Sequence, residues 1–160
     1  MKTLEEKLSE IHNLIGEYLS TVNKLRTDFK DNNLPTPQQI MEHIADRNCE
    51  MLDNVLQKSR KRELVDARQM MAAVLKFGLR MSQANVGDLL GGLDHATIKY
   101  SINQVSNNYN TYKDYREMMN QAIEHLFESV EVQQYIKARI IDPSLDRKQA
   151  MFRFVAVNLG

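Results

Sequence analysis

The 160-residue sequence predicts an all-α fold, and three of its features support this prediction. Apolar residues recur at alternating spacings of four and three, which is the period of one face of a helix. Residues that cap helices stand just before these periodic segments. Proline and glycine separate the segments, where they start or end helices. Each predicted element is justified below in chain order.

Residues 3–30 predict one amphipathic helix. Eight apolar side chains keep the four-three spacing for nearly four heptads, as in a coiled-coil seam: Leu4, Leu8, Ile11, Ile15, Tyr18, Val22, Leu25 and Phe29. Leu14 and Leu19 widen this stripe. Two interpretations stay open. The helix lies along the core of its own chain, or it joins a homodimer through residues 4–29.

The middle of the chain predicts five shorter helices, at about 37–47, 50–57, 63–78, 82–90 and 95–107. Residues 31–37 carry Asn and Pro and interrupt the first helix. Pro37 fits the first turn of the next helix, after a cap at Thr36.

Residues 82–98 predict two short helices joined by a tight turn. Ser82 caps the first helix, and Gly91 and Gly92 end it, because glycine adopts the left-handed conformation without steric cost. Asp94 caps the second helix, which buries one stripe of apolar side chains: Ile98, Ile102 and Val105. Its first turns then point four side chains outward: His95, Ala96, Thr97 and Lys99. A helix-turn-helix presents its recognition helix to the major groove in this way.

After residue 107 the apolar stripe continues to Leu126, so either one long helix bends or two helices meet at a turn. Residues 131–141 predict another helix, which Pro143 interrupts. Residues 151–157 are apolar and partly alternating, which indicates a short strand or a docking tail. We therefore divide the chain into an amphipathic helix (1–34), a helix-turn-helix domain (35–128) and a C-terminal extension (129–160).

The composition predicts a cytoplasmic protein. The chain is 42% hydrophobic and 26% charged, which is ordinary for a soluble domain. No apolar run approaches the roughly 18 residues of a membrane span, and the N-terminus is unlike a signal peptide. The single cysteine, Cys49, allows no internal disulfide and fits a reducing compartment. We expect its side chain to be buried.

Charge is balanced over the whole chain but not along it. The 21 basic and 21 acidic residues give a net charge of zero, whereas DNA-binding domains usually carry a basic excess. Between residues 57 and 104, however, there are eight basic and four acidic residues, which gives this segment a net charge of plus four. Phosphate attraction depends on such a local excess as well as on the total charge.

A basic loop precedes the helix predicted at 63–78. Four of its five residues are cations: Lys58, Arg60, Lys61 and Arg62. A narrow minor groove concentrates negative potential and attracts arginine, so this loop suits groove insertion or phosphate contact. A run this short is otherwise a solvated surface. Its place beside a helix-turn-helix favours DNA contact.

These segments together resemble the C-terminal DNA-binding domain of the bacterial replication initiator DnaA. The resemblance is carried by the sequence Gly-Gly-Leu-Asp-His-Ala-Thr-Ile at residues 91–98, by Ala-Arg-Gln-Met at 67–70 and by the basic loop, and it runs without insertions from about Thr36 to Asn108. It implies a helix-turn-helix bundle that binds double-stranded DNA.

The resemblance also implies roles for individual residues. Arg60 occupies the position of the family's minor-groove arginine, with Lys58 and Arg62 beside it. In the family, the residues at the positions of Asp94, His95 and Ala96 contact bases in the major groove, and the residue at the position of Thr97 contacts phosphate. Arg68 and Gln69 match phosphate contacts, and we expect Lys76 and Lys99 to add more if they are exposed.

Several residues depart from the family pattern. Ala96 replaces a Ser or Thr, Leu93 replaces a basic residue and Gln104 replaces a lysine. These departures put the family's standard target sequence in doubt and favour weaker binding.

We predict no enzyme, no cofactor, no metal site and no small-molecule substrate. The sequence lacks a Gly-x-x-x-x-Gly-Lys-(Ser/Thr) phosphate loop, so we expect no ATPase activity. The four histidines and Cys49 lack metal-ligand spacing. The predicted function is regulation of transcription or replication by site occupancy on double-stranded DNA. The alternative is a protein-interaction module, or a phage replication or packaging adaptor, that kept the fold and lost strong DNA affinity.

Overall fold

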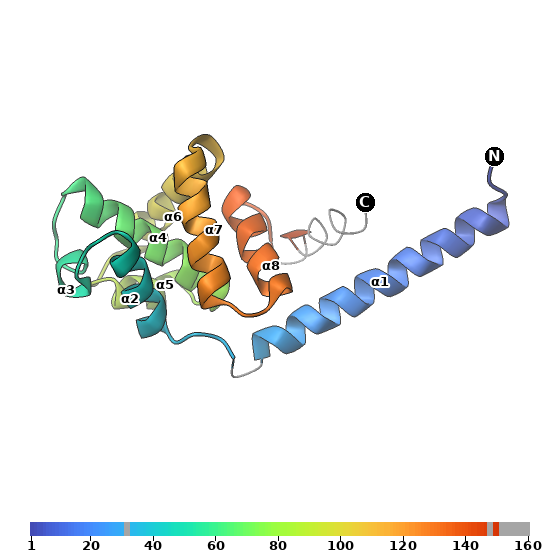
Figure 1. The fold of residues 1–160 in the computed structure, drawn as a ribbon, viewed down its shortest axis with the longest axis horizontal. Coiled ribbons are helices and arrows are strands. Elements are labelled where there is room, and N and C mark those ends of the chain that lie inside the picture. The colour runs from blue at the N-terminus through green and yellow to red at the C-terminus, as the bar shows by residue number, and fades with distance from the viewer. Residues whose placement is uncertain (31–32, 147–148, 151–160) are drawn as a thin grey trace.

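The computed structural model describes residues 1–30, 33–146 and 149–150, and these ranges contain eight helices and no strand. The predicted all-α fold is confirmed (Figure 1). The helices are α1 (Leu4–Lys30), α2 (Pro37–Arg47), α3 (Leu52–Val55), α4 (Arg62–Gly78), α5 (Gln83–Leu89), α6 (His95–Thr111), α7 (Lys113–Leu126) and α8 (Val130–Ile141). Helices α2 to α8 pack together in one bundle, and the N-terminal part of α1 projects from it (Figure 1).

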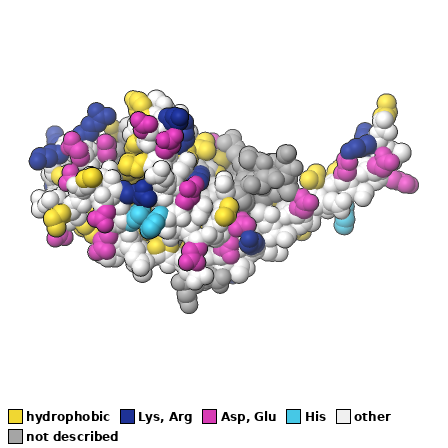
Figure 2. All heavy atoms as spheres, viewed as in Figure 1, with side chains coloured by type: hydrophobic (Ala, Val, Ile, Leu, Met, Phe, Trp, Pro, Cys, Tyr) yellow, Lys and Arg dark blue, Asp and Glu magenta, His cyan; other side chains and the backbone are white. Residues whose placement is uncertain are grey.

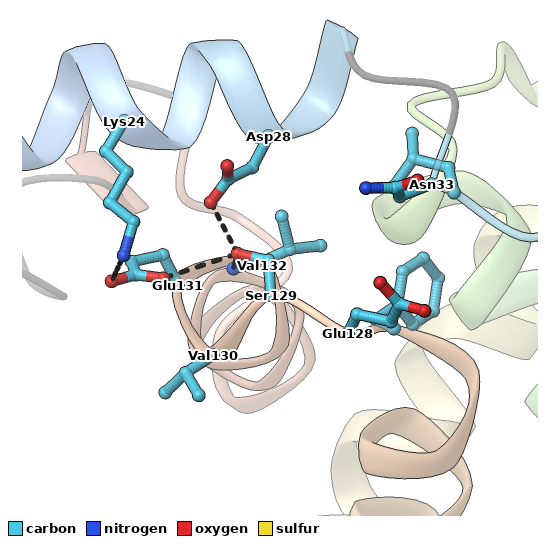
Figure 3. A pocket seen from close by; sticks show the side chains of 10 residues that line it. Lys24, Asp28, Asn33, Glu128, Ser129, Val130, Glu131 and Val132 are labelled. Atoms are coloured by element: carbon cyan, nitrogen blue, oxygen red, sulfur yellow. Dashed lines mark hydrogen bonds and ion pairs between the residues drawn. The ribbon is translucent and has the colours of Figure 1, made fainter.

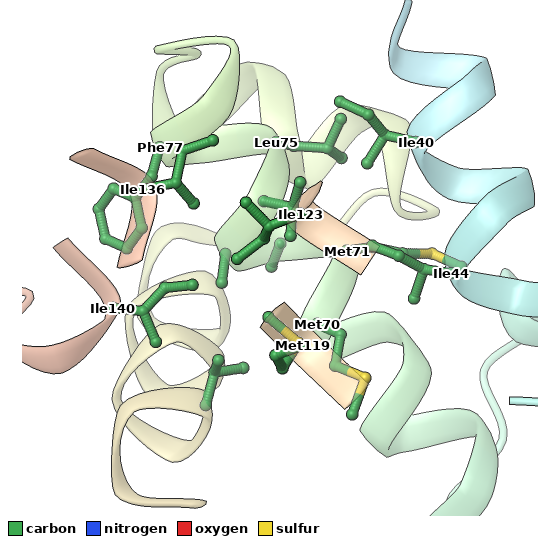
Figure 4. Close-up of a cluster of buried hydrophobic side chains, with 14 of the residues drawn as sticks. Ile40, Ile44, Met70, Met71, Leu75, Phe77, Met119, Ile123, Ile136 and Ile140 are labelled. Carbon is green, nitrogen blue, oxygen red and sulfur yellow. The ribbon is translucent and has the colours of Figure 1, made fainter. Parts of the chain in front are cut away.

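Helix α4 forms the centre of the bundle. Residues 69–75 of this helix are buried without interruption, and its neighbours are α2, α6 and α8. Apolar side chains from α2, α4, α7 and α8 meet in one core, as Figure 4 shows for Ile44, Met71, Ile123 and Ile136. Residues 70–75 of α4 are all apolar, which suits this interior position.

The stripe of α1 divides into two parts. Val22, Leu25 and Phe29 are buried against the bundle, where α1 lies along α8. The apolar side chains before residue 20 are exposed, except for the partly buried Tyr18. The interpretation that α1 lies along its own core therefore holds for its C-terminal part.

Two helices meet at a turn after residue 107, which settles the alternative left open above. Tyr112 separates α6 from α7 with an extended backbone (φ −110°, ψ 118°). The turn is held by Arg116, whose Nη1 donates to the carbonyl oxygen of Tyr109 at 3.0 Å. The Tyr109 hydroxyl in turn donates to Asn120 Oδ1 at 2.5 Å.

Helix α8 lies in the segment assigned to the C-terminal extension and packs into the same core. Val132, Tyr135, Ile136 and Ile140 are all buried. Residues 151–157, for which we expected a strand or a docking tail, lie outside the described residues. In the parts of the chain that the structure describes, no helix is both long and apolar enough to span a membrane.

The expectation that Cys49 is buried was wrong. Its side chain is exposed, because Cys49 stands in the turn that ends α2, with a left-handed backbone (φ 57°). Its amide donates to the carbonyl oxygen of Asp46 at 2.9 Å, which closes the turn and directs the side chain to solvent. The helix predicted at 50–57 is also shorter than expected, at Leu52–Val55.

Candidate nucleic-acid interface

The predicted turn and caps between α5 and α6 are confirmed. Ser82 Oγ accepts from the amide of Asn85 at 3.1 Å, and Asp94 Oδ1 accepts from the amide of Thr97 at 2.8 Å. Gly91 and Gly92 both have left-handed backbones, with φ of 95° and 81°. Each capping side chain bonds to an amide three residues ahead, and each glycine supplies the left-handed backbone of the turn. These interactions are local in the sequence, so the sequence alone could predict them.

Gly87 is a further requirement of this turn, and one that sequence reasoning missed. Its carbonyl oxygen accepts from the amides of Gly92 and Leu93 at 2.9 and 3.0 Å. A Cβ atom at residue 87 would lie 2.1 Å from the carbonyl oxygen of Leu93, so no larger residue fits without moving the backbone. The available signal was a glycine inside an apolar helical pattern, where glycine is unfavourable and so indicates a packing requirement.

The first turns of α6 combine a buried stripe with an open face. Ile98, Ile102 and Val105 are buried, as predicted. The four side chains expected to face outward are all exposed, namely His95, Ala96, Thr97 and Lys99, and the capping residue Asp94 is exposed as well. Hydrogen bonds from Thr97 lower the pKa of the Asp94 carboxyl group, so this group is a charged acceptor at neutral pH. The helix start is thus accessible to a partner.

The cations of the basic loop are exposed as well. Lys58, Arg60, Lys61 and Arg62 all face solvent. Arg62 Nε lies 3.9 Å from Asp66 Oδ2, an exposed pair that contributes little to stability and leaves the guanidinium available. Burial raises the pKa of the Asp66 carboxyl group, and the charge of Arg62 opposes that effect.

Arg68 ties the basic loop to α4. Its guanidinium donates to the carbonyl oxygen of Ser59, and its Nε also contacts the carbonyl oxygen of Leu64 at 3.4 Å. Burial lowers the pKa of this guanidinium, which nevertheless remains charged. Sequence reasoning assigned Arg68 only a phosphate contact. In the structure its side chain positions the loop that carries Arg60.

The loop and the turn lie next to each other. A Cβ atom at Gly91 would lie 2.9 Å from the carbonyl oxygen of Leu56, which precedes Lys58 by two residues. Lys and Arg side chains gather at the end of the molecule where α3 leads into α4 (Figure 2). The segment just before the cationic loop therefore lies against the turn just before α6. We call this surface the binding edge, formed by residues 58–62 and 94–99.

Three of the predicted site residues lie outside the binding edge: Arg68, which supports the loop as described above, Gln69 and Lys76. Gln69 is only 8% exposed within α4. Lys76 is half-buried and lines a small pocket with Arg80, Tyr135 and Arg139, at the opposite end of α4. It follows Arg62 by 14 residues, which is about 21 Å along a helix axis. The structure therefore separates Lys76 from the cations of the loop.

Tyr100 was not singled out from the sequence. Its side chain is 60% exposed and lies four residues after Ala96, so both occupy one face of α6. The spacing of four residues from Ala96 places Tyr100 on the outward face of the predicted helix. A single exposed aromatic residue is common on protein surfaces, however, so this spacing alone did not mark it as a site residue.

The fold and the binding edge define the class of this region as a helix-turn-helix domain. Comparison with protein families gives the particular type. Residues 37–105 match the family described as the bacterial dnaA protein helix-turn-helix. Residues 37–105 of this chain are therefore similar to a bacterial DnaA helix-turn-helix, in agreement with the sequence resemblance.

Curated relatives agree with this assignment. Over 75 residues the chain is 36% identical to the chromosomal replication initiator protein DnaA of Synechococcus sp. (strain JA-2-3B'a(2-13)), covering 44% of this chain and 16% of the relative. It is 35% identical over 69 residues to DnaA of Ureaplasma parvum, covering 43% and 15%. It is 26% identical over 92 residues to DnaA of Spiroplasma citri, covering 58% and 20%. The chain thus spans a fifth or less of these relatives.

Proposed function

We propose that this protein binds double-stranded DNA through the binding edge and regulates transcription or replication in the cytoplasm without ATPase activity. The observation that carries the proposal is the accessible start of α6 beside an exposed cationic loop. Phosphate neutralisation by such cations supplies most of the sequence-independent affinity for DNA. The similarity of residues 37–105 to a DnaA helix-turn-helix supports the same ligand.

In this proposal α6 enters the major groove with its N-terminal end. Asp94 accepts from a cytosine amino group, and His95 donates to a base acceptor. Ala96 contacts a thymine methyl group. Thr97 and Lys99 contact phosphates and fix the register.

The basic loop provides the second set of contacts. Arg60 reaches into the adjacent minor groove, where negative potential is concentrated. Lys58 and Arg62 contact the backbone beside it. Arg68 acts mainly by holding the loop through Ser59. The buried Gln69 and the distant Lys76 contribute less than the resemblance implied.

The alternative function is a protein-interaction module, or a phage replication or packaging adaptor, with little DNA affinity. The zero net charge of the chain favours this alternative, as does the small apolar side chain of Ala96 at the start of α6. The exposed cations of residues 58–62 favour DNA, because a protein-interaction surface has no need of four such charges in one loop.

Self-association belongs to the same proposal. A homodimer through residues 4–29 was one of the two interpretations left open for α1, and the packing of α1 limits the residues that such a homodimer can use. Val22, Leu25 and Phe29 are buried within the chain itself, so a second copy has residues 4–19 available.

The decisive experiment is a titration of duplexes selected from a random pool with the double variant Arg60→Ala and Arg62→Ala. Near 50 mM salt we expect affinity to fall by at least about tenfold and the salt slope to flatten by about two units, because two phosphate or groove contacts are lost. The melting temperature should stay unchanged, since both side chains are exposed.

The matched control is Lys30→Ala with Lys113→Ala, which removes two exposed cations outside the binding edge. Its affinity should stay close to that of the unmodified protein. If both double variants bind equally well, the loop makes no specific contact. If the unmodified protein binds no duplex at low salt, the protein-interaction module is the better description.

A further inference from the structure

The N-terminal half of α1 presents a wide apolar face to solvent. Six leucine and isoleucine side chains there are between 48% and 73% exposed: Leu4, Leu8, Ile11, Leu14, Ile15 and Leu19. This part of the helix extends away from the bundle (Figure 1). Contiguous exposed apolar surface of this kind marks an interaction site.

The pattern of this face fits a coiled coil. Leu4, Leu8, Ile11 and Ile15 alternate spacings of four and three, which places them at the inner a and d positions of two heptads. The acidic side chains Glu6, Glu10 and Glu17 lie on the outer face. A second identical helix covers every inner position with a matching Leu or Ile layer and leaves the acidic face in water.

The flanking leucines determine the orientation. Leu14 and Leu19 occupy heptad positions g and e, on opposite sides of the seam. In a parallel pair each g side chain meets the e side chain of the next heptad on the other helix, so Leu14 of one copy contacts Leu19 of the other. An antiparallel pair places g beside g, and Lys7 then lies against Leu14. Parallel pairing buries both leucines without desolvating a lysine.

The C-terminal half of α1 is joined firmly to the bundle. Lys24 Nζ lies 2.7 Å from Glu131 Oε1, and Ser129 Oγ donates to Asp28 Oδ2 at 2.6 Å (Figure 3). The Phe29 ring meets the Tyr135 ring edge to face at 5.2 Å.

A third element reaches the same end of α1. The guanidinium of Arg80, after α4, lies 4.9 Å from the centre of the Phe29 ring. One continuous helix therefore carries the exposed apolar face at its start and is fixed to the bundle at its end.

We infer that residues 4–19 of α1 pair in parallel with a second copy of this chain, and that the resulting dimer binds duplex DNA carrying two inverted half-sites at a fixed spacing. The parallel pair has a two-fold axis and places both domains at the same end. A two-fold dimer of helix-turn-helix domains matches inverted half-sites, whose spacing follows from the protein. The DNA part of this inference rests on the proposed function.

Disulfide cross-linking tests the orientation. All variants carry Cys49→Ser, because the native thiol is exposed. With Ile15→Cys, oxidation should join most of the protein into covalent dimers, since equivalent inner positions meet in a parallel pair. With Asn13→Cys, on the outer face, little should form. Cross-linking of Leu4→Cys to Ile15→Cys in a mixture, without Ile15→Cys homodimers, would show antiparallel pairing and overturn the inference.

The mass in solution tests the stoichiometry. Light scattering should give two protomers for the unmodified chain and one for Leu8→Glu with Ile15→Glu, because each glutamate would be buried in the seam. Ser9→Glu with Asn13→Glu, on the outer face, is the control and should remain dimeric. A mass of one, three or four protomers for the unmodified chain would overturn the inference.

Binding to paired half-sites tests the fixed spacing. After selection of the preferred spacing, an insertion of about five base pairs, half a helical turn, should lower the affinity of the dimer at least about tenfold. Four glycines inserted after Ser20 should reduce that penalty to less than about threefold, because they uncouple the pair from the bundle. Equal affinity of the unmodified dimer for all spacings would overturn the inference.

The monomeric variant separates this inference from the proposed function. Leu8→Glu with Ile15→Glu should bind a single half-site as well as the unmodified protein does. If single half-sites are bound and spacing has no effect, DNA binding stands and the dimer geometry fails. If no duplex is bound at all, the proposed function fails.

Discussion

The two ends of the bundle use the same residue types in opposite ways. At the binding edge Lys58, Arg60 and Arg62 are exposed. At the other end Arg80 lies over Phe29, and Arg139 lies 4.8 Å from the centre of the Phe77 ring. We call this second region the scaffold end, formed by the C-terminal halves of α1 and α4 together with α8. Cations there stabilise packing by contact with aromatic faces.

In the proposed function, position in the fold rather than residue type therefore separates the cations that contact DNA from those that stabilise the bundle. Helix α4 has both kinds, with Arg62 at its start and Lys76 in its last turn. Changes at the scaffold end should therefore alter stability and spare DNA affinity at a single half-site. Changes at the binding edge should show the reverse, except where the backbone itself is strained.

The largest effect is expected from Phe29→Ala at the scaffold end. Phe29 is buried between Arg80 and Tyr135, and loss of a buried phenylalanine typically costs about 3–5 kcal/mol. Urea denaturation should show this loss, whereas single half-site affinity should persist where the variant remains folded. Tyr112→Ala, at an exposed aromatic, is the control and should change stability by less than about 1 kcal/mol. Equal effects of the two variants would contradict the division into two ends.

A smaller effect, and one that joins stability to binding, is expected from Gly91→Ala. The backbone of Gly91 is left-handed, and a Cβ atom there would lie 2.9 Å from the Leu56 carbonyl oxygen. The substitution should therefore lower the free energy of unfolding by about 2–3 kcal/mol. Because the strain falls between loop and turn, duplex affinity should fall too.

Gly92→Ala is the matched control for Gly91→Ala. Its backbone is also left-handed, but no atom lies within 4 Å of the place that a Cβ atom would occupy, so about 1 kcal/mol of backbone strain is expected. Thermal denaturation and duplex titration of both variants check this order. A larger loss for residue 92 than for residue 91 would show that the Leu56 contact does not matter.

The smallest effect is expected from pH. His43 and His125 stack at 4.4 Å between α2 and α7, and His43 Nε2 accepts from Arg47 Nε at 2.8 Å. Burial lowers the pKa of His43 below its ordinary 6.5, the charges of His125 and Arg47 lower it further, and Asp46 opposes them. The neutral form is thus favoured on folding.

This contribution to stability should be present above pH 6.5 and be lost as the pH falls through the folded-state pKa of His43. Urea denaturation between pH 7.5 and 5 should show the decline, and His43→Gln should reduce it. His95→Gln, at an exposed position of the binding edge, should leave the profile unchanged. An identical profile for both variants would remove His43 from this role.

Features that depend on a few neighbouring residues were predictable from sequence. The caps at Thr36, Ser82 and Asp94 each accept from an amide three residues ahead, so spacing alone indicates them. The all-α fold followed from the same local patterns, whereas the similarity of residues 37–105 to a DnaA helix-turn-helix was recognised from the resemblance of their sequence.

Features that depend on distant contacts were not predictable. The apolar stripe of α1 keeps one spacing throughout, yet its side chains are exposed in the N-terminal half and buried in the C-terminal half. The cause is α8, which lies about a hundred residues later in the sequence and covers only the C-terminal half. Lys76 and Gln69 look like surface residues of a helix, but α4 is surrounded on nearly every side. The part that Arg68 plays required knowing that its guanidinium reaches Ser59.

The close approach of Gly91 to Leu56 has a consequence for how such a protein changes its target. In the proposed function, this contact fixes the loop that enters one groove relative to the helix that enters the next, so neither can be shifted alone. New preferences must then come from exchanging individual side chains on a fixed frame, one base pair at a time.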